Sequence, residues 1–222
     1  MREVTIQIAS IPSRIHLLNK TIDSLYGQAE TINVFLNGYD FVPTFLNKSS
    51  INVQKLDNST GASAKFHGVE KIKEYIFTCD DDIIYPSHYV RSTLKRLKEY
   101  NDKCIVTYHG KVFKKKPIQD YYKDEQTKYH FLKRLMQDKK VDIGGTGVMA
   151  FHSSALKIKY KDFYSRNMSD IHLSRVAKKQ NVDIVCLNHL SNFFKYMSPQ
   201  TSIYRDYFDN CKEQTNEVNK FL

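Results

Sequence analysis

The sequence lacks tryptophan, and its 222 residues include only four cysteines. No apolar run approaches the roughly 20 residues needed to cross a bilayer. The chain begins Met1-Arg2-Glu3 and enters an apolar segment directly, which leaves no room for a signal peptide. These absences predict a cytoplasmic protein. The cysteines are far apart and form no CxxC pair, so buried reduced thiols are favoured over a disulfide or a zinc site: Cys79, Cys104, Cys186 and Cys211.

Two common nucleotide-binding signatures are absent as well. No GxxxxGK[ST] loop occurs, since residues 144–147 (GGTG) have no lysine, and no GxGxxG follows the first apolar segment. The absence of both disfavours P-loop and dinucleotide-binding chemistry.

Positive charge is in excess. Lys and Arg number 34 against 24 Asp and Glu, a formal net charge of +10. The lysines cluster at residues 111–116, 133–140 and 157–161. Such patches suit a phosphorylated acceptor or peripheral contact with an anionic membrane at its cytosolic face, and a solvated surface is the alternative. No nucleic-acid partner is expected.

Apolar segments alternate with helical patterns through the first half of the chain. Strands are expected at residues 4–10, 32–38, 51–56 and 75–79. Helices are expected after Ser13, at 63–74 and from Pro86 onward. The second half predicts strands at 104–109, 147–152 and 182–187, with helices near 125–137 and at 170–179. This rhythm predicts an α/β fold with a mostly parallel central sheet flanked by helices.

The strongest functional signal is residues 75–86, YIFTCDDDIIYP. An apolar strand there ends in Asp80, Asp81 and Asp82, called the acidic triplet below. Ligands of open α/β sheets bind at the carboxyl ends of strands. In an extended segment Asp80 and Asp82 share one face, where a divalent cation would relieve their repulsion and bridge to a diphosphate. Oxygen ligands suit Mg²⁺ or Mn²⁺. A solvated acidic turn is the alternative.

Four segments, in this order, resemble family 2-like glycosyltransferases of the GT-A fold. They are residues 8–14 (IASIPSR), residues 37–40 (NGYD), the acidic triplet as the DxD motif, and residues 169–174 (SDIHLS). The resemblance implies one Rossmann-like GT-A domain over residues 1–201, with a donor-binding half to about 110 and an acceptor-side half at 111–201. Residues 202–222 would form a polar tail that could be helical.

The resemblance also implies a site for a nucleotide-sugar donor. Asp82 and Asp80 would ligate Mn²⁺ or Mg²⁺, Asp80 would alternatively contact the ribose, and His189 is a candidate third ligand. Lys65 would face the donor phosphates, although a solvated lysine is the alternative, and the glycines near residue 145 would equally serve a simple turn. The donor-binding residues implied are Ile11, Pro12, Arg14, Asn37, Asp40, Lys65, Asp80, Asp81, Gly145 and Thr146.

For catalysis, the resemblance implies that Asp170 accepts the proton of the acceptor hydroxyl as that hydroxyl attacks the anomeric carbon. The alternative is that Asp170 only caps the helix that begins there. The expected function is a metal-dependent, inverting transfer of a sugar from a nucleotide diphosphate, with UDP favoured, to a hydroxyl group. The acceptor would be a glycan or a lipid-linked molecule in surface-glycan biosynthesis.

Two other classes of function stay open. A sugar nucleotidyltransferase shares the sheet and the metal, but residues 10–14 (SIPSR) are not its usual glycine-rich and basic loop. A non-catalytic, polyanion-binding module accounts for the positive charge and leaves the acidic triplet without a role.

Overall fold

A computed structural model describes residues 3–199 and 206–222 of the chain. Eight strands form the central sheet in the order β3-β2-β1-β4-β11-β6-β12-β9. The first four run parallel to one another, and β11 runs antiparallel to both of its neighbours, β4 and β6. The strands are β1 (Val4–Ser10), β2 (Thr31–Asn37), β3 (Ile51–Leu56), β4 (Tyr75–Cys79), β6 (Ile105–Thr107), β9 (Lys139–Lys140), β11 (Val148–His152) and β12 (Ile184–Cys186).

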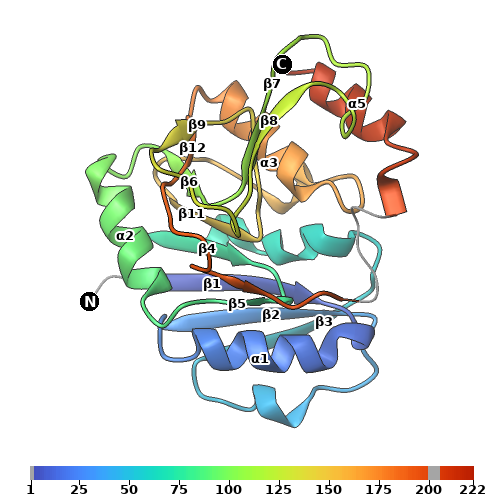
Figure 1. Ribbon diagram of the computed structural model, residues 1–222. Helices are drawn as coiled ribbons and strands as arrows, with labels where there is room; N and C mark the ends of the chain where they lie inside the picture. The colour runs from blue at the N-terminus through green and yellow to red at the C-terminus, as the bar shows by residue number, and fades with distance from the viewer. Residues whose placement is uncertain (1–2, 200–205) are drawn as a thin grey trace.

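Helices cover both faces of this sheet, so the predicted α/β fold with a mostly parallel sheet is confirmed (Figure 1). Helices α1 (Ile15–Leu25) and α2 (Tyr89–Glu99) share one apolar cluster with the sheet. Helix α3 (Ser169–Lys179) shares a second cluster. Strand β4 contributes Phe77 to the first cluster and Ile76 to the second, because successive side chains of a strand point to opposite faces. Both faces of the central strands are therefore buried.

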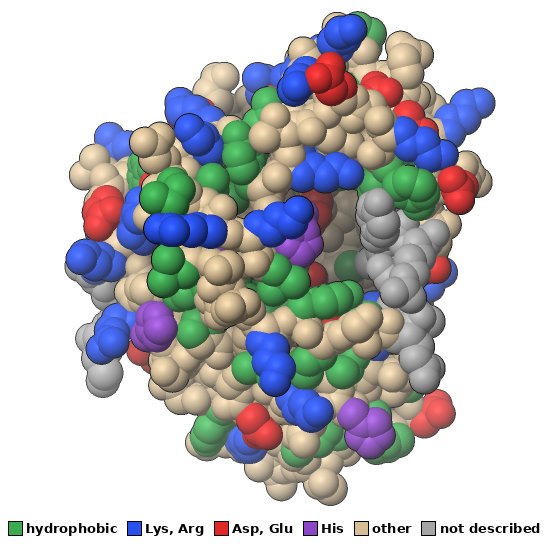
Figure 2. Space-filling view, in the orientation of Figure 1, with side chains coloured by type: hydrophobic (Ala, Val, Ile, Leu, Met, Phe, Trp, Pro, Cys, Tyr) green, Lys and Arg blue, Asp and Glu red, His purple; other side chains and the backbone are tan. Residues whose placement is uncertain are grey.

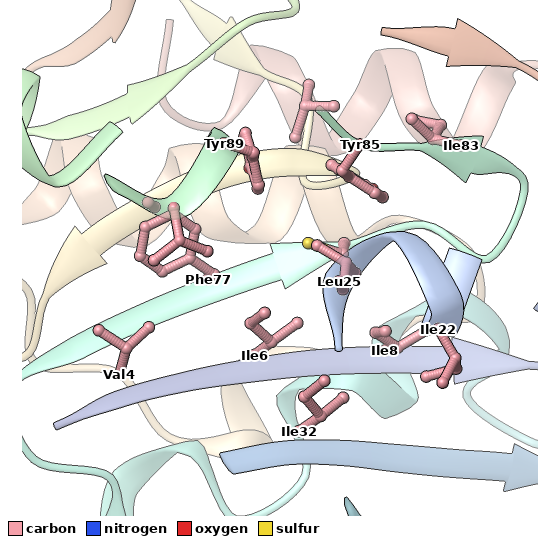
Figure 3. Packing of buried hydrophobic residues seen from close by; sticks show 14 of the residues in the cluster. Val4, Ile6, Ile8, Ile22, Leu25, Ile32, Phe77, Ile83, Tyr85 and Tyr89 are labelled. Atoms are coloured by element: carbon pink, nitrogen blue, oxygen red, sulfur yellow. The ribbon is translucent and has the colours of Figure 1, made fainter. Parts of the chain in front are cut away.

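The apolar pattern of α1 explains its place against the sheet. Leu18, Ile22 and Leu25 recur at helical spacing and are fully buried. Figure 3 shows Ile22 beside Ile8 of β1, with Leu25 above the same strand. The helix ends before Gly27, whose φ of +81° is a backbone conformation that glycine adopts without strain.

Two smaller sheets accompany the central sheet. Strand β7 (Gly110–Phe113) pairs with β8 (Gln126–Tyr129) on one side and with β10 (Ile143–Gly144) on the other. Strand β13 (Lys195–Tyr196) pairs with β5 (Ile83–Ile84), the strand that directly follows the acidic triplet.

Two predicted helices are wrong. The helix expected near residues 125–137 is β8 followed by turns, because this segment pairs with β7 as a hairpin. The helix expected at 63–74 is two 3₁₀ turns, Gly61–Phe66 and Val69–Lys71. Gly68, with φ at +70°, separates them and stops a continuous helix.

The C-terminal segment packs against the hairpin and α3. Residues 202–205 of the expected tail lie outside the described residues. Helix α5 (Lys212–Asn219) begins after Cys211, and Val218 shares an apolar cluster with Phe113 of β7 and Ile171 of α3. All four cysteines are free and buried, as predicted. No helix among the described residues has the length and apolar character needed to span a membrane.

Candidate functional site

The acidic triplet lines a hollow of about 430 Å³ at the edge where β1, β2 and β4 end. The backbone turns at Asp81 and Asp82, so the triplet is not extended as expected, but all three of its residues line the same hollow. This acidic hollow also holds part of the predicted donor set. Figure 2 shows a hollow near the middle of one face, with acidic side chains inside it. The predicted residues that line the hollow are Ile11, Arg14, Asn37, Lys65, Asp80, Asp81 and Asp82.

Lys65 and Asp80 form an ion pair at the wall of the hollow. The Lys65 side chain is 2% exposed, whereas that of Asp80 is 44% exposed, so the carboxylate is the partner that a ligand would reach. Burial opposes the charge on Lys65, but Asp80 outweighs this effect and raises the pKa of the ammonium group. Burial also opposes the charge on Asp80, and Lys65 nevertheless lowers the pKa of that carboxyl. Lys65 is thus a buried cation inside the site and not a solvated lysine.

Arg14 divides one guanidinium group between two carboxylates. It follows β1 in the 3₁₀ turn Pro12–Arg14, and its Nη1 lies 2.9 Å from Oδ1 of Asp81 and 3.2 Å from Oδ2 of Asp82. Burial raises the pKa of Asp82 to about 7, and the charges of Asp80 and Asp81 add to the effect. Burial likewise raises the pKa of Asp81, against the influence of Arg14. Negative charge in the triplet therefore exceeds what Arg14 and Lys65 neutralise.

Asp170 is held by the glycine-bearing loop at residues 144–147. Its Oδ1 accepts hydrogen bonds from the Thr146 backbone N–H at 2.8 Å and from the Thr146 hydroxyl at 2.6 Å. Met168 occupies the N-cap position of α3 and makes no side-chain cap bond. The cap alternative for Asp170 is therefore wrong. Burial raises the pKa of Asp170, although the two bonds from Thr146 act in the opposite direction.

The same loop touches two further polar side chains. A Cβ atom built on Gly147 would stand 2.0 Å from Oδ2 of Asp80, and one built on Gly145 would stand 2.9 Å from the ring of His109. Only glycine fits at these positions without displacing those side chains. The loop therefore brings the triplet, Asp170 and His109 together, although Gly145 and Thr146 do not line the hollow itself.

Sequence reasoning missed His109, which lies at the carboxyl end of β6. Its ring is 5.0 Å from that of His130, and its Nδ1 is buried with no hydrogen-bond partner among the described residues. Burial lowers the pKa of His109 to about 3, helped by His130 and Lys111, so the imidazole is neutral. Strand β6 runs in the same direction as β4, so the residue after it reaches the same edge of the sheet as the triplet. This placement depends on the order of the strands in the sheet, so the sequence alone held no signal for it.

The structure does not bring His189 to the acidic hollow. Its Nδ1 donates to the Leu187 carbonyl at 2.7 Å, and its ring packs edge-on against Tyr108. His189 lines a different hollow, together with His88 and Phe193. Among residues 3–199 and 206–222, no group of three or more His, Cys, Asp or Glu side chains is arranged to hold a metal ion.

Three other predicted features lie away from the acidic hollow. Pro12 begins the turn that carries Arg14, and Asp40 is exposed beyond the end of β2. The basic cluster at residues 157–161 lines a separate hollow with Arg175 and Lys179. None of these residues lines the hollow of the triplet.

Comparison with known proteins finds a likeness in structure but none in sequence. No family model matches the chain, and no curated protein sequence matches it either. Among solved structures, the chain is similar to the crystal structure of TarS residues 1–349 from Staphylococcus aureus, with a TM-score of 0.51 over 98% of this chain and 69% of that one. The likeness supports the α/β fold with a mostly parallel central sheet that is described above. The two sequences are 11% identical, so the likeness concerns architecture, and the activity has to be argued from the site.

Proposed function

We propose that the protein is a metal-dependent, inverting glycosyltransferase that moves a sugar from a nucleotide diphosphate, UDP being favoured, to a hydroxyl acceptor in surface-glycan biosynthesis. The observation that carries the proposal is the acidic triplet at the carboxyl end of β4, in one hollow with Arg14 and Lys65. Asp170 lies close enough for the charge of Asp80 to raise its pKa. Such a transfer needs a site that binds the leaving diphosphate and a group that accepts the proton. These residues would supply both.

The triplet has the donor chemistry that Mn²⁺ or Mg²⁺ requires. Oδ2 of Asp81 is buried without a hydrogen-bond partner among the described residues, and the pKa of Asp82 is about 7, so negative charge is under-compensated. Mg²⁺ sites in nucleotide enzymes commonly use one or two carboxylates plus the substrate phosphates. Asp82 and Asp80 would supply those carboxylates, and His189 is left out because it lines another hollow. The bound cation would neutralise charge on the departing diphosphate.

The other residues of the hollow suit the two ends of a nucleotide. Asn37 donates its amide N–H to the Gly61 carbonyl at 2.9 Å, which leaves its Oδ1 buried and without a partner in the described part of the chain. That oxygen would accept an N–H of the base, such as uracil N3–H, beside Ile11. Lys65 and Arg14 would face the diphosphate, where opposite charge favours binding.

Asp170 would act as the general base. The proton of the acceptor hydroxyl would pass to its carboxylate while the oxygen attacks the anomeric carbon from the side opposite the diphosphate. Thr146 fixes Oδ1 and so fixes the orientation of the group. A carboxyl pKa raised by burial brings a base nearer to the working pH, where general base catalysis is most effective. Direct displacement of this kind inverts the anomeric carbon.

A donor-hydrolysis screen tests the proposal. UDP-, GDP-, CMP- and TDP-sugars are incubated with the protein, with and without Mn²⁺, and release of the nucleotide is measured. The expected result is metal-dependent release of UDP. Pyrophosphate release from a nucleoside triphosphate and a sugar phosphate would instead identify a nucleotidyltransferase. No metal-dependent thermal stabilisation by UDP would favour the polyanion-binding module.

A further inference from the structure

Lys111 and Lys128 lie directly opposite each other on the antiparallel strands β7 and β8. Like charges in directly opposed positions of two strands destabilise the pair. Other lysines of the same hairpin region have acidic partners: Lys114 lies 2.6 Å from Glu125, and Lys116 lies 2.7 Å from Asp142. Lys111 and Lys128 have no carboxylate within 4 Å among the described residues. This opposed pair is therefore not neutralised by a neighbouring carboxylate in the described part of the chain, unlike Lys114 and Lys116.

The surroundings of Lys111 hold its ammonium group in a defined place. Nζ lies 3.4 Å from the centroid of the Tyr121 ring and donates to the Tyr121 carbonyl at 3.3 Å, with the Tyr122 ring at 5.2 Å. Burial and, to a smaller extent, the charge of Lys128 lower the pKa of Lys111 to about 7, although Asp170 acts in the opposite direction. An anion beside the pair would therefore favour the charged form of Lys111.

The opposed pair belongs to the Asp170 side of the site and not to the acidic hollow. Neither lysine lines the hollow of the triplet, so the diphosphate proposed there is not their counter-ion. Asp170 influences both Lys111 and Tyr121 electrostatically, which places these groups near the proposed base. Figure 2 shows Lys and Arg side chains and a histidine along the upper edge of the hollow on this face.

We propose that Lys111 and Lys128 bind a phosphate group carried by the acceptor, so that a hydroxyl of the same molecule reaches Asp170. The inference rests on the proposed transferase function and specifies its acceptor as a phosphorylated polyol or sugar. A phosphate monoester carries about −1.5 to −2 charge near pH 7, which matches two ammonium groups. Lysine binds phosphate as a point charge and needs no planar fork geometry. A neutral acceptor would not relieve the repulsion between the two ammonium groups.

Calorimetric titration tests the inference, with glycerol 3-phosphate, glycerol and inorganic phosphate as probes. UDP and Mn²⁺ are present throughout, so that the acidic hollow is filled. The wild type should bind glycerol 3-phosphate more tightly than inorganic phosphate and should bind glycerol far more weakly. Lys128→Gln and Lys111→Met should each weaken glycerol 3-phosphate binding by about tenfold or more, the loss expected for a charge-assisted hydrogen bond.

Lys114→Gln is the matched control, because it removes the same charge from the residue that directly follows β7. Unlike the opposed pair, Lys114 already has an acidic partner, Glu125. The affinity of this control for glycerol 3-phosphate should equal that of the wild type. Lys128 is exposed, and its loss removes a repulsion, so Lys128→Gln should melt no lower than the wild type. The melting temperature therefore separates lost binding from lost folding.

Two results would overturn the inference while the transferase function survives. One is equal glycerol 3-phosphate affinity in the wild type and both opposed-pair variants. The other is inorganic phosphate binding as tightly as glycerol 3-phosphate, which would indicate a simple anion site. Failure of the proposed function is separately visible as absence of metal-dependent UDP binding in the wild type. In that case the acceptor assignment falls with it.

Discussion

Gly147 lies so close to Asp80 that a Cβ atom at position 147 would stand 2.0 Å from Oδ2 of the aspartate. The Gly147 carbonyl also accepts hydrogen bonds from the Asp80 backbone N–H at 3.1 Å and from the Tyr85 hydroxyl at 2.5 Å. The backbone of this loop is therefore fixed against the start of the acidic triplet. A side chain there cannot be accommodated by a shift of the loop alone.

Gly147→Ala should consequently displace the Asp80 carboxylate and weaken UDP binding in the presence of Mn²⁺ by about tenfold or more, the loss of one charge-assisted contact. Thermal shift with UDP and Mn²⁺ measures the effect. Gly27→Ala is the control: its φ of +81° makes alanine cost about 1 kcal/mol of folding stability, but no atom lies within 4 Å of its added Cβ. The control should melt lower and keep its UDP-dependent shift. Equal UDP affinity in Gly147→Ala would contradict the assignment of Asp80 to the donor site.

A second prediction follows from the pKa of about 7 at Asp82, which burial and the neighbouring aspartates raise above the value in the unfolded chain. Because the folded pKa is the higher one, the folded protein binds an extra proton between about pH 4 and pH 7, and its stability falls as pH rises through that window. Asp82→Asn, which resembles the protonated form, should thus be more stable than the wild type at pH 8. The advantage should disappear below about pH 4.

Chemical denaturation at pH 4 and pH 8, without divalent cations, measures this difference. Asp23→Asn is the control, since it removes the same charge from an exposed position paired with Lys48. The control should show no comparable gain at pH 8. Addition of Mn²⁺ at pH 8 should stabilise the wild type and not Asp82→Asn, because the amide is a poor ligand in place of a carboxylate.

Much of the sheet could be predicted from the sequence because its central strands are buried on both faces. Strand β4, YIFTC, is buried at every residue and reads as a mainly apolar run, and β1, VTIQIAS, is buried at all but one residue and has an apolar residue at every second position from Val4 to Ile8, so both are easily recognised. Strand β8 could not be predicted in the same way. Its residues, QTKY, are polar and partly exposed, and only their pairing with β7 makes them a strand.

The candidate site could be predicted in part for a similar reason. The acidic triplet directly follows β4, a strand that its apolar residues make easy to predict. The position of the triplet at the edge of the sheet could therefore be predicted from the local sequence. His109 is brought to Gly145 by the reversal of direction at β11, which lies between β4 and β6 in the sheet but after both in sequence. A contact of this kind depends on strand order, and no spacing in the sequence encodes it.

Thr146 provides a third prediction, because its hydroxyl donates to Oδ1 of Asp170 at 2.6 Å and favours the charged carboxylate. Thr146→Val removes that bond and keeps the backbone N–H bond, so the pKa of Asp170 should rise. The rising limb of the rate against pH should therefore move to higher pH. A pH profile of transfer, with the exposed Thr127→Val as control, measures the shift. An unmoved profile would mean that ionisation of Asp170 does not govern the rate.

The last prediction concerns the base itself. Asp170→Asn should lower the rate of transfer by about 10²–10⁴-fold, the range expected when general base catalysis is lost. The asparagine Oδ1 can still accept both hydrogen bonds from Thr146, so the loop and α3 should keep their places. Metal-dependent UDP affinity should stay within about twofold of the wild type, because Asp170 does not line the acidic hollow.

Steady-state rates, calorimetric UDP binding and NMR coupling constants of the product together decide the matter. The wild-type product should carry the inverted anomeric configuration, since one displacement with proton transfer to Asp170 leaves no step that could restore the original one. A retained configuration would require a second displacement, or attack from the face that the diphosphate leaves, and would remove Asp170 from the proposed role of base, even if Asp82 still bound the metal. A normal rate in Asp170→Asn would assign Asp170 to loop positioning alone, because the amide preserves that function and abolishes only the acceptance of a proton.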